Sequence, residues 1–153
     1  MVSITTPSAN RPAAPESSRK VAWGRYALVA LGTVVAAVLA NLIVYYLGAA
    51  VVDYDPTFLV LATPGGTVIF TIIPAIVAPL LYAPILRFAR RPERIFTIIS
   101  VIVLVVSIIP DFTYIPTVPG SSAPQIAVLV LQHLVAALVI TGILTRLTRP
   151  RGH

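Results

Sequence analysis

Long apolar runs separated by short polar segments dominate the pattern along this chain. Four runs are evident, at about 26–52, 67–86, 95–109 and 124–144. A helix needs about 20 apolar residues to cross the hydrocarbon core of a bilayer. Strands can cross it only as a closed barrel, and four runs cannot close one. The pattern therefore predicts an all-α integral membrane protein, a bundle of four helices.

Prolines and glycines mark the expected boundaries of these spans. The second span should begin after the breaker Pro64-Gly65-Gly66. The third should end at Pro110, because the residue before a proline avoids helical backbone angles. Pro124 should open the fourth span, as a proline in a first helical turn. Inside the second span, three prolines each remove a backbone hydrogen bond and should kink the helix: Pro74, Pro79 and Pro84.

The segments outside the spans lack a periodic apolar pattern. Residues 1–24 are rich in Ser, Thr, Pro and Ala, which predicts a disordered tail. Residues 25–147 form the four-span domain, and residues 148–153 form a second tail. A secretory signal is the alternative for the N-terminal part, but its apolar region runs only about 7 to 15 residues. The first apolar run is far longer, so we expect it to be retained.

Composition agrees with a membrane protein and excludes several kinds of chemistry. Of the 153 residues, 58% are apolar and 10% are charged, and the mean hydropathy is +0.95. A soluble domain is about a quarter charged. The chain has no cysteine, which excludes disulfides, thiolate metal sites and cysteine nucleophiles. No cofactor is expected.

All eleven Lys and Arg residues lie on one side of the predicted bundle. Four precede the first span, four lie between the second and third, and three follow the fourth. The other two loops carry Asp53, Asp55 and Asp111 instead. By the positive-inside rule, both termini are then cytoplasmic (N-in/C-in) in a multi-pass protein of the cell inner (plasma) membrane. The cations should contact anionic lipid head groups, and no nucleic acid is expected, because no separate folded module carries them.

Four polar residues within the spans form a candidate intramembrane site: Asn41, Ser107, Gln132 and His133. At 1.5 Å per residue, Asn41 and His133 lie roughly 16 and 14 Å below the outer ends of their spans, so they could meet. Ionisable residues in a bilayer are costly and normally face the bundle interior or a cavity. His133 is therefore the strongest single candidate. In the alternative, these groups only hydrogen-bond between helices, at about 0.6 kcal/mol each.

Ser107, Asp111 and His133 suggest a hydrolytic triad. Ser107 and Asp111 would share a helix face if the helix continued past Pro110. The expected depths argue against a triad, because Asp111 belongs at the outer interface and His133 lies deeper. No oxyanion loop is recognisable either. No catalytic residue is assigned, and the chain is expected not to be an enzyme.

Asp53 and Asp55 have the spacing of an acidic metal-binding pair. Two carboxylates in a loop make a weak site, and acidic residues are ordinary on the outer side of such a protein. No metal is therefore expected.

Small residues recur along one face of the first span, at Gly32, Ala36, Ala40 and Gly48. This spacing lets two helices approach closely. It predicts packing against another span of the same chain, against a second copy, or against another membrane subunit.

Several of these residues together resemble a family of small four-span bacterial membrane proteins of unknown function. The resemblance runs from Arg25 to Arg146. It implies the four-helix architecture and the importance of Ser107 and His133, and it supplies no activity, substrate or cofactor. The residues that carry it are Asn41, the arginines before the third span, Ser107 ahead of Pro110, and Gln132-His133-Leu134-Val135-Ala136-Ala137.

The scarcity of polar groups in the spans favours a structural or accessory subunit of a membrane assembly. One His, one Asn and one Gln are too few for an obvious ion or proton path. The alternative is a small transporter or channel component with a polar site near Asn41 and His133. The prolines of the second span favour that alternative, because kinked helices free carbonyls that can line a cavity.

Overall fold

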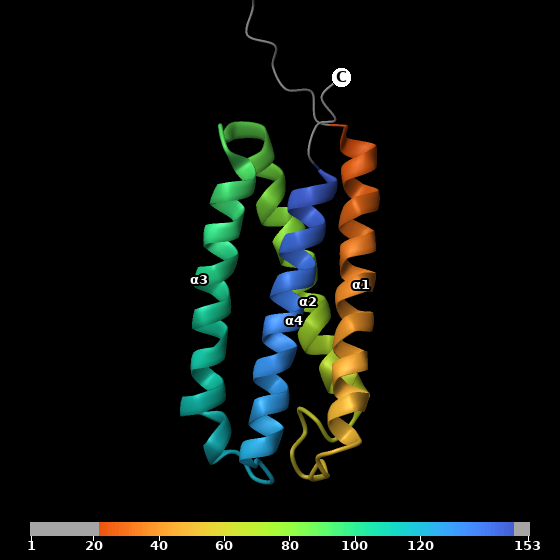
Figure 1. The fold of residues 1–153 in the computed structure, drawn as a ribbon, viewed down its shortest axis with the longest axis vertical. Coiled ribbons are helices and arrows are strands. Elements are labelled where there is room, and N and C mark those ends of the chain that lie inside the picture. Colours follow the sequence, from red (N-terminus) through yellow and green to blue (C-terminus); the bar gives the residue numbers. More distant parts are fainter. Residues whose placement is uncertain (1–21, 149–153) are drawn as a thin grey trace, which may run out of the picture.

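The computed structural model describes residues 22–148, which form four long helices (Figure 1). All four are long and apolar enough to cross a membrane, and the described residues contain no strand. The predicted all-α, four-helix architecture of a multi-pass membrane protein is confirmed. The tails predicted at the chain ends fall largely outside the described residues. The elements are α1 (Trp23–Ala49), α2 (Pro64–Phe88), α3 (Pro92–Thr113), η1, a short 3-10 helix (Ile115–Thr117), and α4 (Ala123–Leu147).

The helices stand side by side, and successive helices run in opposite directions (Figure 1). Helix α1 packs against α4 and α2, whereas α3 packs mainly against α4. Helix α2 crosses obliquely behind α4 in this view. Residues 50–63 and 114–122 connect the helices at one end of the bundle, which we call the loop end. The opposite end, the arginine end, carries Arg25, Arg87, Arg90, Arg91, Arg94 and Arg146.

Two boundaries predicted from prolines are wrong. Pro64 is the first residue of α2 instead of preceding the helix. The N–H groups of a first turn have no partner within the helix, so a proline, which lacks an N–H, is tolerated there. Pro110 lies inside α3, which continues to Thr113, and Tyr114 N donates to Pro110 O at 2.9 Å. Pro110 removes one backbone bond, to Val106. Ending the helix there would leave more backbone groups unpaired in an apolar environment, so the helix continues.

Helix α1 also begins earlier than predicted, at Trp23, so the last residues of the expected 1–24 tail are helical. It ends at Ala49, short of the predicted limit at residue 52. The three prolines expected to kink α2 lie inside it without ending it. Tyr26 on α1 supports this proline-rich helix, since its Oη donates to Pro79 O at 2.5 Å.

Small and polar residues form the faces along which the helices meet. The large aliphatic side chains point outward instead, where lipid would cover them, as with Leu28 and Leu39. Small residues allow the close helix approach that packing within a membrane requires. The buried face of α1 is Tyr26, Thr33, Ala37, Asn41, Tyr45 and Gly48, and that of α2 is Thr67, Thr71, Ala75, Pro79, Tyr82 and Leu86.

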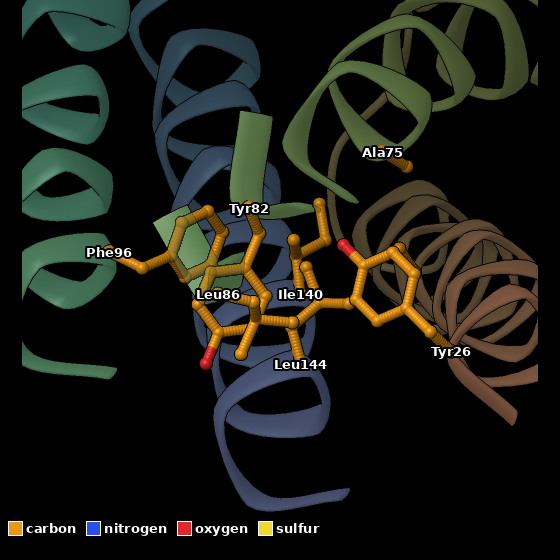
Figure 2. Close-up of a cluster of buried hydrophobic side chains, with 8 residues drawn as sticks. Tyr26, Ala75, Tyr82, Leu86, Phe96, Ile140 and Leu144 are labelled. Atoms are coloured by element: carbon orange, nitrogen blue, oxygen red, sulfur yellow. The ribbon is translucent and has the colours of Figure 1, made fainter. Parts of the chain in front are cut away.

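Two clusters of buried side chains form the core. The first lies toward the arginine end, where Tyr26 from α1 and Phe96 from α3 reach toward residues of α2 and α4 (Figure 2). The ring centroids of Tyr82 and Phe96 are 4.4 Å apart. The second cluster lies near the loop end and includes Phe58 and Leu61, which fold inward from the loop 50–63 and are fully buried.

Helix α3 is the most loosely held of the four. Its buried residues are Pro92, Phe96 and Asp111. Phe96 anchors it toward the arginine end, and Asp111 anchors it toward the loop end. Between these two anchors the helix exposes isoleucines and valines, such as Val101 and Val105. One of its two anchors is therefore an ionisable residue.

Candidate functional site

Asn41 and Gln132 belong to a hydrogen-bonded network that joins α1, α2 and α4. Asn41 Nδ2 donates to Thr71 Oγ1 at 2.9 Å, and Thr71 Oγ1 donates to Thr67 O at 2.7 Å. Gln132 Nε2 donates to Thr67 Oγ1 at 3.2 Å. All four side chains are buried. The network ties three helices together and leaves one buried acceptor, Asn41 Oδ1, without a partner among the described residues.

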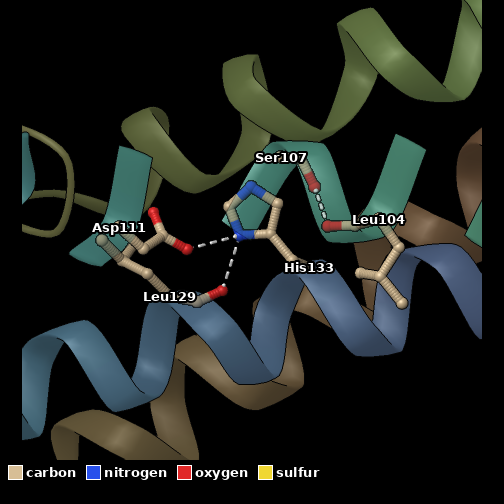
Figure 3. Close-up of polar contacts among 5 residues, drawn as sticks. All are labelled: Leu104, Ser107, Asp111, Leu129 and His133. Carbon is tan, nitrogen blue, oxygen red and sulfur yellow. Dashed lines mark hydrogen bonds and ion pairs between the residues drawn. The ribbon is translucent and has the colours of Figure 1, made fainter. Parts of the chain in front are cut away.

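His133 faces α3 and not Asn41. Its Nδ1 lies 2.9 Å from Leu129 O on its own helix and 3.2 Å from Asp111 Oδ2 on α3 (Figure 3). Successive residues of a helix point about 100° apart, so Gln132 and His133 reach different neighbours. The similar depths predicted for Asn41 and His133 therefore do not make one site. Of the four candidate residues, Asn41 and Gln132 belong to the network and His133 pairs with Asp111. Ser107 lies on α3, one turn before Asp111.

The predicted separation of Asp111 from His133 in depth is wrong. Because α3 continues to Thr113, Asp111 lies inside the helix, and it is only 4% exposed. Asp111 is about 3 Å from the end of α3, and His133 is about 15 Å from the start of α4. Side chains tilt toward the N-terminus of their helix, so in these antiparallel helices His133 leans toward the loop end and Asp111 toward the arginine end. Depth counted along the backbone leaves out this reach of the side chains.

The contacts of His133 indicate which of its two ring nitrogens carries the hydrogen when the ring is neutral. A backbone carbonyl only accepts, so Nδ1 must be protonated to bond Leu129 O. This N–H is directed at Leu129, and Asp111 Oδ2 makes no aligned hydrogen bond with the described residues, although it lies 3.2 Å from the ring. Figure 3 shows Nε2 on the ring edge away from both contacts. Nε2 is therefore the nitrogen available to gain or lose a proton.

The two side chains differ in their access to the surroundings. The side chain of His133 is 36% exposed, whereas that of Asp111 is 6% exposed. A lone charge in the middle of a membrane helix costs about 3 kcal/mol or more. A pair that shares one proton is neutral overall, either as neutral acid and imidazole or as carboxylate and imidazolium. Asp111 and His133 can therefore hold a proton at this depth without a net charge.

Ser107 lies one turn before Asp111 on α3 (Figure 3). Its Oγ donates to Leu104 O at 2.9 Å. A nucleophilic serine must instead give its proton to the imidazole. The structure thus pairs Asp111 with His133, but it directs the serine hydrogen to the backbone.

The glycines predicted to mediate close helix contacts differ in their surroundings. A Cβ at Gly48 would overlap Tyr54 Oη and lie 3.0 Å from Val128, so this glycine is needed for packing within the chain. A Cβ at Gly32 would meet nothing within 4 Å. Contacts of Gly32, Ala36 and Ala40 with a second chain stay a prediction.

Asp53 and Asp55, the acidic pair considered as a metal site, lie in the loop 50–63 at the loop end of the bundle. Among residues 22–148, no three His, Cys, Asp or Glu side chains gather as they would around a metal ion.

Comparison with known proteins places the whole bundle in one family. Residues 17–150, which include all four helices, match DUF6069, a family of unknown function. No curated protein and no solved structure matches the chain. The resemblance to a family of small four-span membrane proteins of unknown function is confirmed. The chain belongs to the DUF6069 family.

Proposed function

We propose that this protein is a small component of a membrane transport system in which Asp111 and His133 take up and release a proton. The observation that carries the proposal is the 3.2 Å contact between a buried aspartate and a histidine inside membrane-spanning helices. Such groups are costly in a bilayer, and pumps and transporters use chains of Asp, Glu and His as proton relays.

The position of the pair supports exchange with water at the loop end. Asp111 lies about 3 Å along the axis from the end of α3 at Thr113. The half-exposed His133 ring connects this buried carboxyl group to the surroundings. Because Asp111 is also one of the two anchors of the loosely held α3, a change in its charge would act on the packing of that helix.

Proton movement into liposomes tests this proposal. The purified protein is reconstituted into vesicles that contain a pH-sensitive dye, and a pH step is imposed outside. We expect faster internal acidification than in protein-free vesicles, and loss of that increment in Asp111→Asn and His133→Ala. Thr97→Ala removes an exposed hydroxyl from the same helix and serves as the matched control. A flux that both pair variants leave unaltered would remove the pair from the mechanism.

A structural or accessory subunit is the second candidate. The exposed isoleucine and valine face of α3, between Phe96 and Asp111, favours it, because this face packs on nothing within the described chain. A partner subunit there, or a second copy against Gly32, Ala36 and Ala40, would bury apolar surface. Copurification in mild detergent tests this role, and a chain that stays monomeric and alone in every condition argues against it.

Both candidates are non-enzymatic roles. The bond from Ser107 Oγ to Leu104 O supports this assignment, because the hydroxyl hydrogen is not offered to His133. A serine-directed covalent probe tests it. No labelling is expected, and labelling that Ser107→Ala abolishes would show an enzyme.

We also propose that the arginine end faces the cytoplasm of the plasma membrane and contacts anionic lipid head groups. The separation of the described arginines from Asp53 and Asp55, at opposite ends of the bundle, supports this orientation. Reporter fusions at Thr57 and Ser121 should both report the non-cytoplasmic side. If both fusions report the cell interior, the proposed orientation is wrong.

A further inference from the structure

The loop 50–63 closes the loop end of the bundle beside α1 and α2, next to the buried network that joins α1, α2 and α4 (Figure 1). We propose that residues 58–61 of this loop, which we call the plug, form a gate that opens to admit small polar molecules, such as water, to the network. The proposal goes beyond proton exchange at Asp111 and does not depend on it, because the network lies on other helix interfaces.

The network is buried although it lies close to the loop end. At 1.5 Å per residue, Thr67 is about 5 Å from the start of α2 and Asn41 is about 12 Å from the end of α1. Thr67 is nevertheless only 2% exposed. The plug approaches α2 at this point, because a Cβ at Gly66 would overlap Val60 O. The plug therefore covers the start of α2 beside the network.

Two apolar side chains of the plug seal the network. Phe58 and Leu61 are fully buried. They pack in the second core cluster, whose other members lie one turn from Asn41 or Gln132 toward the loop end. This cluster is therefore the next layer of side chains between the network and the loop end. Its other members are Tyr45, Val128 and Leu129.

Asn41 gives the network an atom that can bind an admitted molecule. Its Oδ1 is buried and accepts no hydrogen bond from the described residues. A buried acceptor without a donor is unfavourable, and a water molecule would supply the donor. This atom is sealed from solvent while the plug is in place, so such a molecule enters only when part of the cover moves. The plug is the part of the cover that does not belong to a helix.

The plug can move without unfolding a helix. Its backbone hydrogen bonds are local, since Phe58 N donates to Asp55 O and Leu61 N donates to Phe58 O, each at 3.0 Å. The segment can therefore shift as one unit. An open hollow of about 440 Å³ lies between this loop and the loop 114–122, and it gives the loop 50–63 room to shift.

Hydroxyl groups and apolar contacts hold the plug against the bundle. Tyr45 Oη on α1 donates to Leu61 O at 3.2 Å, and Tyr54 Oη from the loop donates to Tyr45 O at 2.9 Å. Leu59 lies between the two buried side chains of the plug, but it is 80% exposed. Phe58 and Tyr45 are therefore the positions at which a substitution should ease opening, and Leu59 is the matched control.

Labelling of a single cysteine tests the gate, because the chain has no cysteine of its own. Thr67→Cys places a thiol in the network, and a small, charged methanethiosulfonate reagent reports its access to water in the purified full-length protein in detergent. We expect slow labelling that Phe58→Ala accelerates at least about tenfold and Tyr45→Phe about fivefold, since each removes a contact that holds the plug closed. Leu59→Ala should leave the rate unchanged.

Ala75→Cys distinguishes opening of the plug from unfolding. Ala75 is fully buried in the first core cluster, toward the arginine end, so its thiol should stay unlabelled in every variant over the same period. Tyr45→Phe keeps the ring and provides the same comparison if Phe58→Ala does not fold. Labelling of Thr67→Cys that is absent, or equally fast in the plug variants and the Leu59→Ala control, would overturn the proposal. Equal acceleration of Ala75→Cys would also overturn it, because the whole bundle would then be opening.

Discussion

His133 Nδ1 and Asp111 Oδ2 lie 3.2 Å apart across the interface between α4 and α3. The contact joins a half-exposed ring to a buried carboxyl group on the helix that is otherwise anchored mainly by Phe96. Removal of either partner leaves the other in an apolar environment without its counterpart. The proposed proton exchange and the attachment of α3 therefore depend on the same two atoms.

A double-mutant cycle measures this dependence. Asp111→Asn and His133→Gln should each destabilise the protein, and the double variant should be less destabilised than their sum by about 1 kcal/mol, as for residues in direct contact. Unfolding in mixed micelles of increasing SDS content provides the free energies. Strict additivity would show that the two side chains do not interact.

Thr71→Val should be more harmful than Asn41→Leu. The valine leaves the buried Asn41 Nδ2 without its acceptor, which costs about 1–3 kcal/mol. The leucine removes an amide whose Oδ1 already lacks a partner, so its cost should stay near 0.6 kcal/mol. The same SDS titration compares them, and the double variant should recover part of the loss. A larger loss in Asn41→Leu would mean that Asn41 Oδ1 has a partner, such as an internal water.

Gly48→Ala and Gly32→Ala form a matched pair on one helix. The first methyl group would overlap Tyr54 Oη and press on Val128, so a loss of about 1–3 kcal/mol is expected. The second meets open space, and alanine favours helix, so stability should stay the same or rise by up to about 1 kcal/mol. Thermal unfolding in detergent distinguishes them. A loss of stability in Gly32→Ala would point to a second chain on this face.

Tyr26→Phe should cost about 1 kcal/mol, because it removes the hydrogen bond to Pro79 O while keeping the ring. Tyr46→Phe is the control, since Tyr46 is 61% exposed on the same helix. Unfolding free energies of the two variants provide the comparison. Equal values would contradict a stabilising role for this bond.

The loop contact of Asp55 should depend on pH in one direction. Its pKa is lower in the folded protein than the ordinary value of 3.8, because Thr57 donates two hydrogen bonds to it. The contact therefore stabilises the fold above that ordinary value and is lost as pH falls through the lower folded pKa. The Thr57 amide resonance reports this titration, and Thr57→Val should raise its midpoint. An unchanged midpoint would show that the hydroxyl bond is absent in solution.

The fold could be predicted from the sequence because run length alone identifies membrane spans. The inward face of α1 could not be predicted from composition. Small residues occur on two of its faces, and the buried face is that of Thr33, Ala37 and Asn41, not that of Gly32, Ala36 and Ala40. The ends of α2 and α3 could not be predicted, because the same residue type opens one helix at Pro64 and is passed over in another at Pro110. Pro64 fits the first turn of a helix, which needs no N–H at that residue. At Pro110 the need to pair backbone groups in lipid overrides the local preference for a break.

The candidate site could be predicted only in part. His133 stands out as an ionisable residue in a span, but its partner depends on where α3 ends and on the direction in which both side chains point. Local pattern encodes neither feature. Asn41 and His133 share an estimated depth, yet they lie on different interfaces, because depth says nothing about the direction in which a side chain points. The bonds of Gln125 to Gly120 and Ser122 depend on the course of the loop 114–122, for which the sequence carries no periodic signal.

Infrared difference spectra recorded between acidic and alkaline buffer test the central claim most directly, because they detect protons on Asp111 and His133 without a known substrate. The account predicts a protonated-carboxyl band that changes with pH and disappears in Asp111→Asn. It also predicts imidazole bands that change over the same pH range and shift when Asp111 is replaced. Difference spectra of Asp111→Asn that keep every carboxyl and imidazole band of the wild type would contradict it.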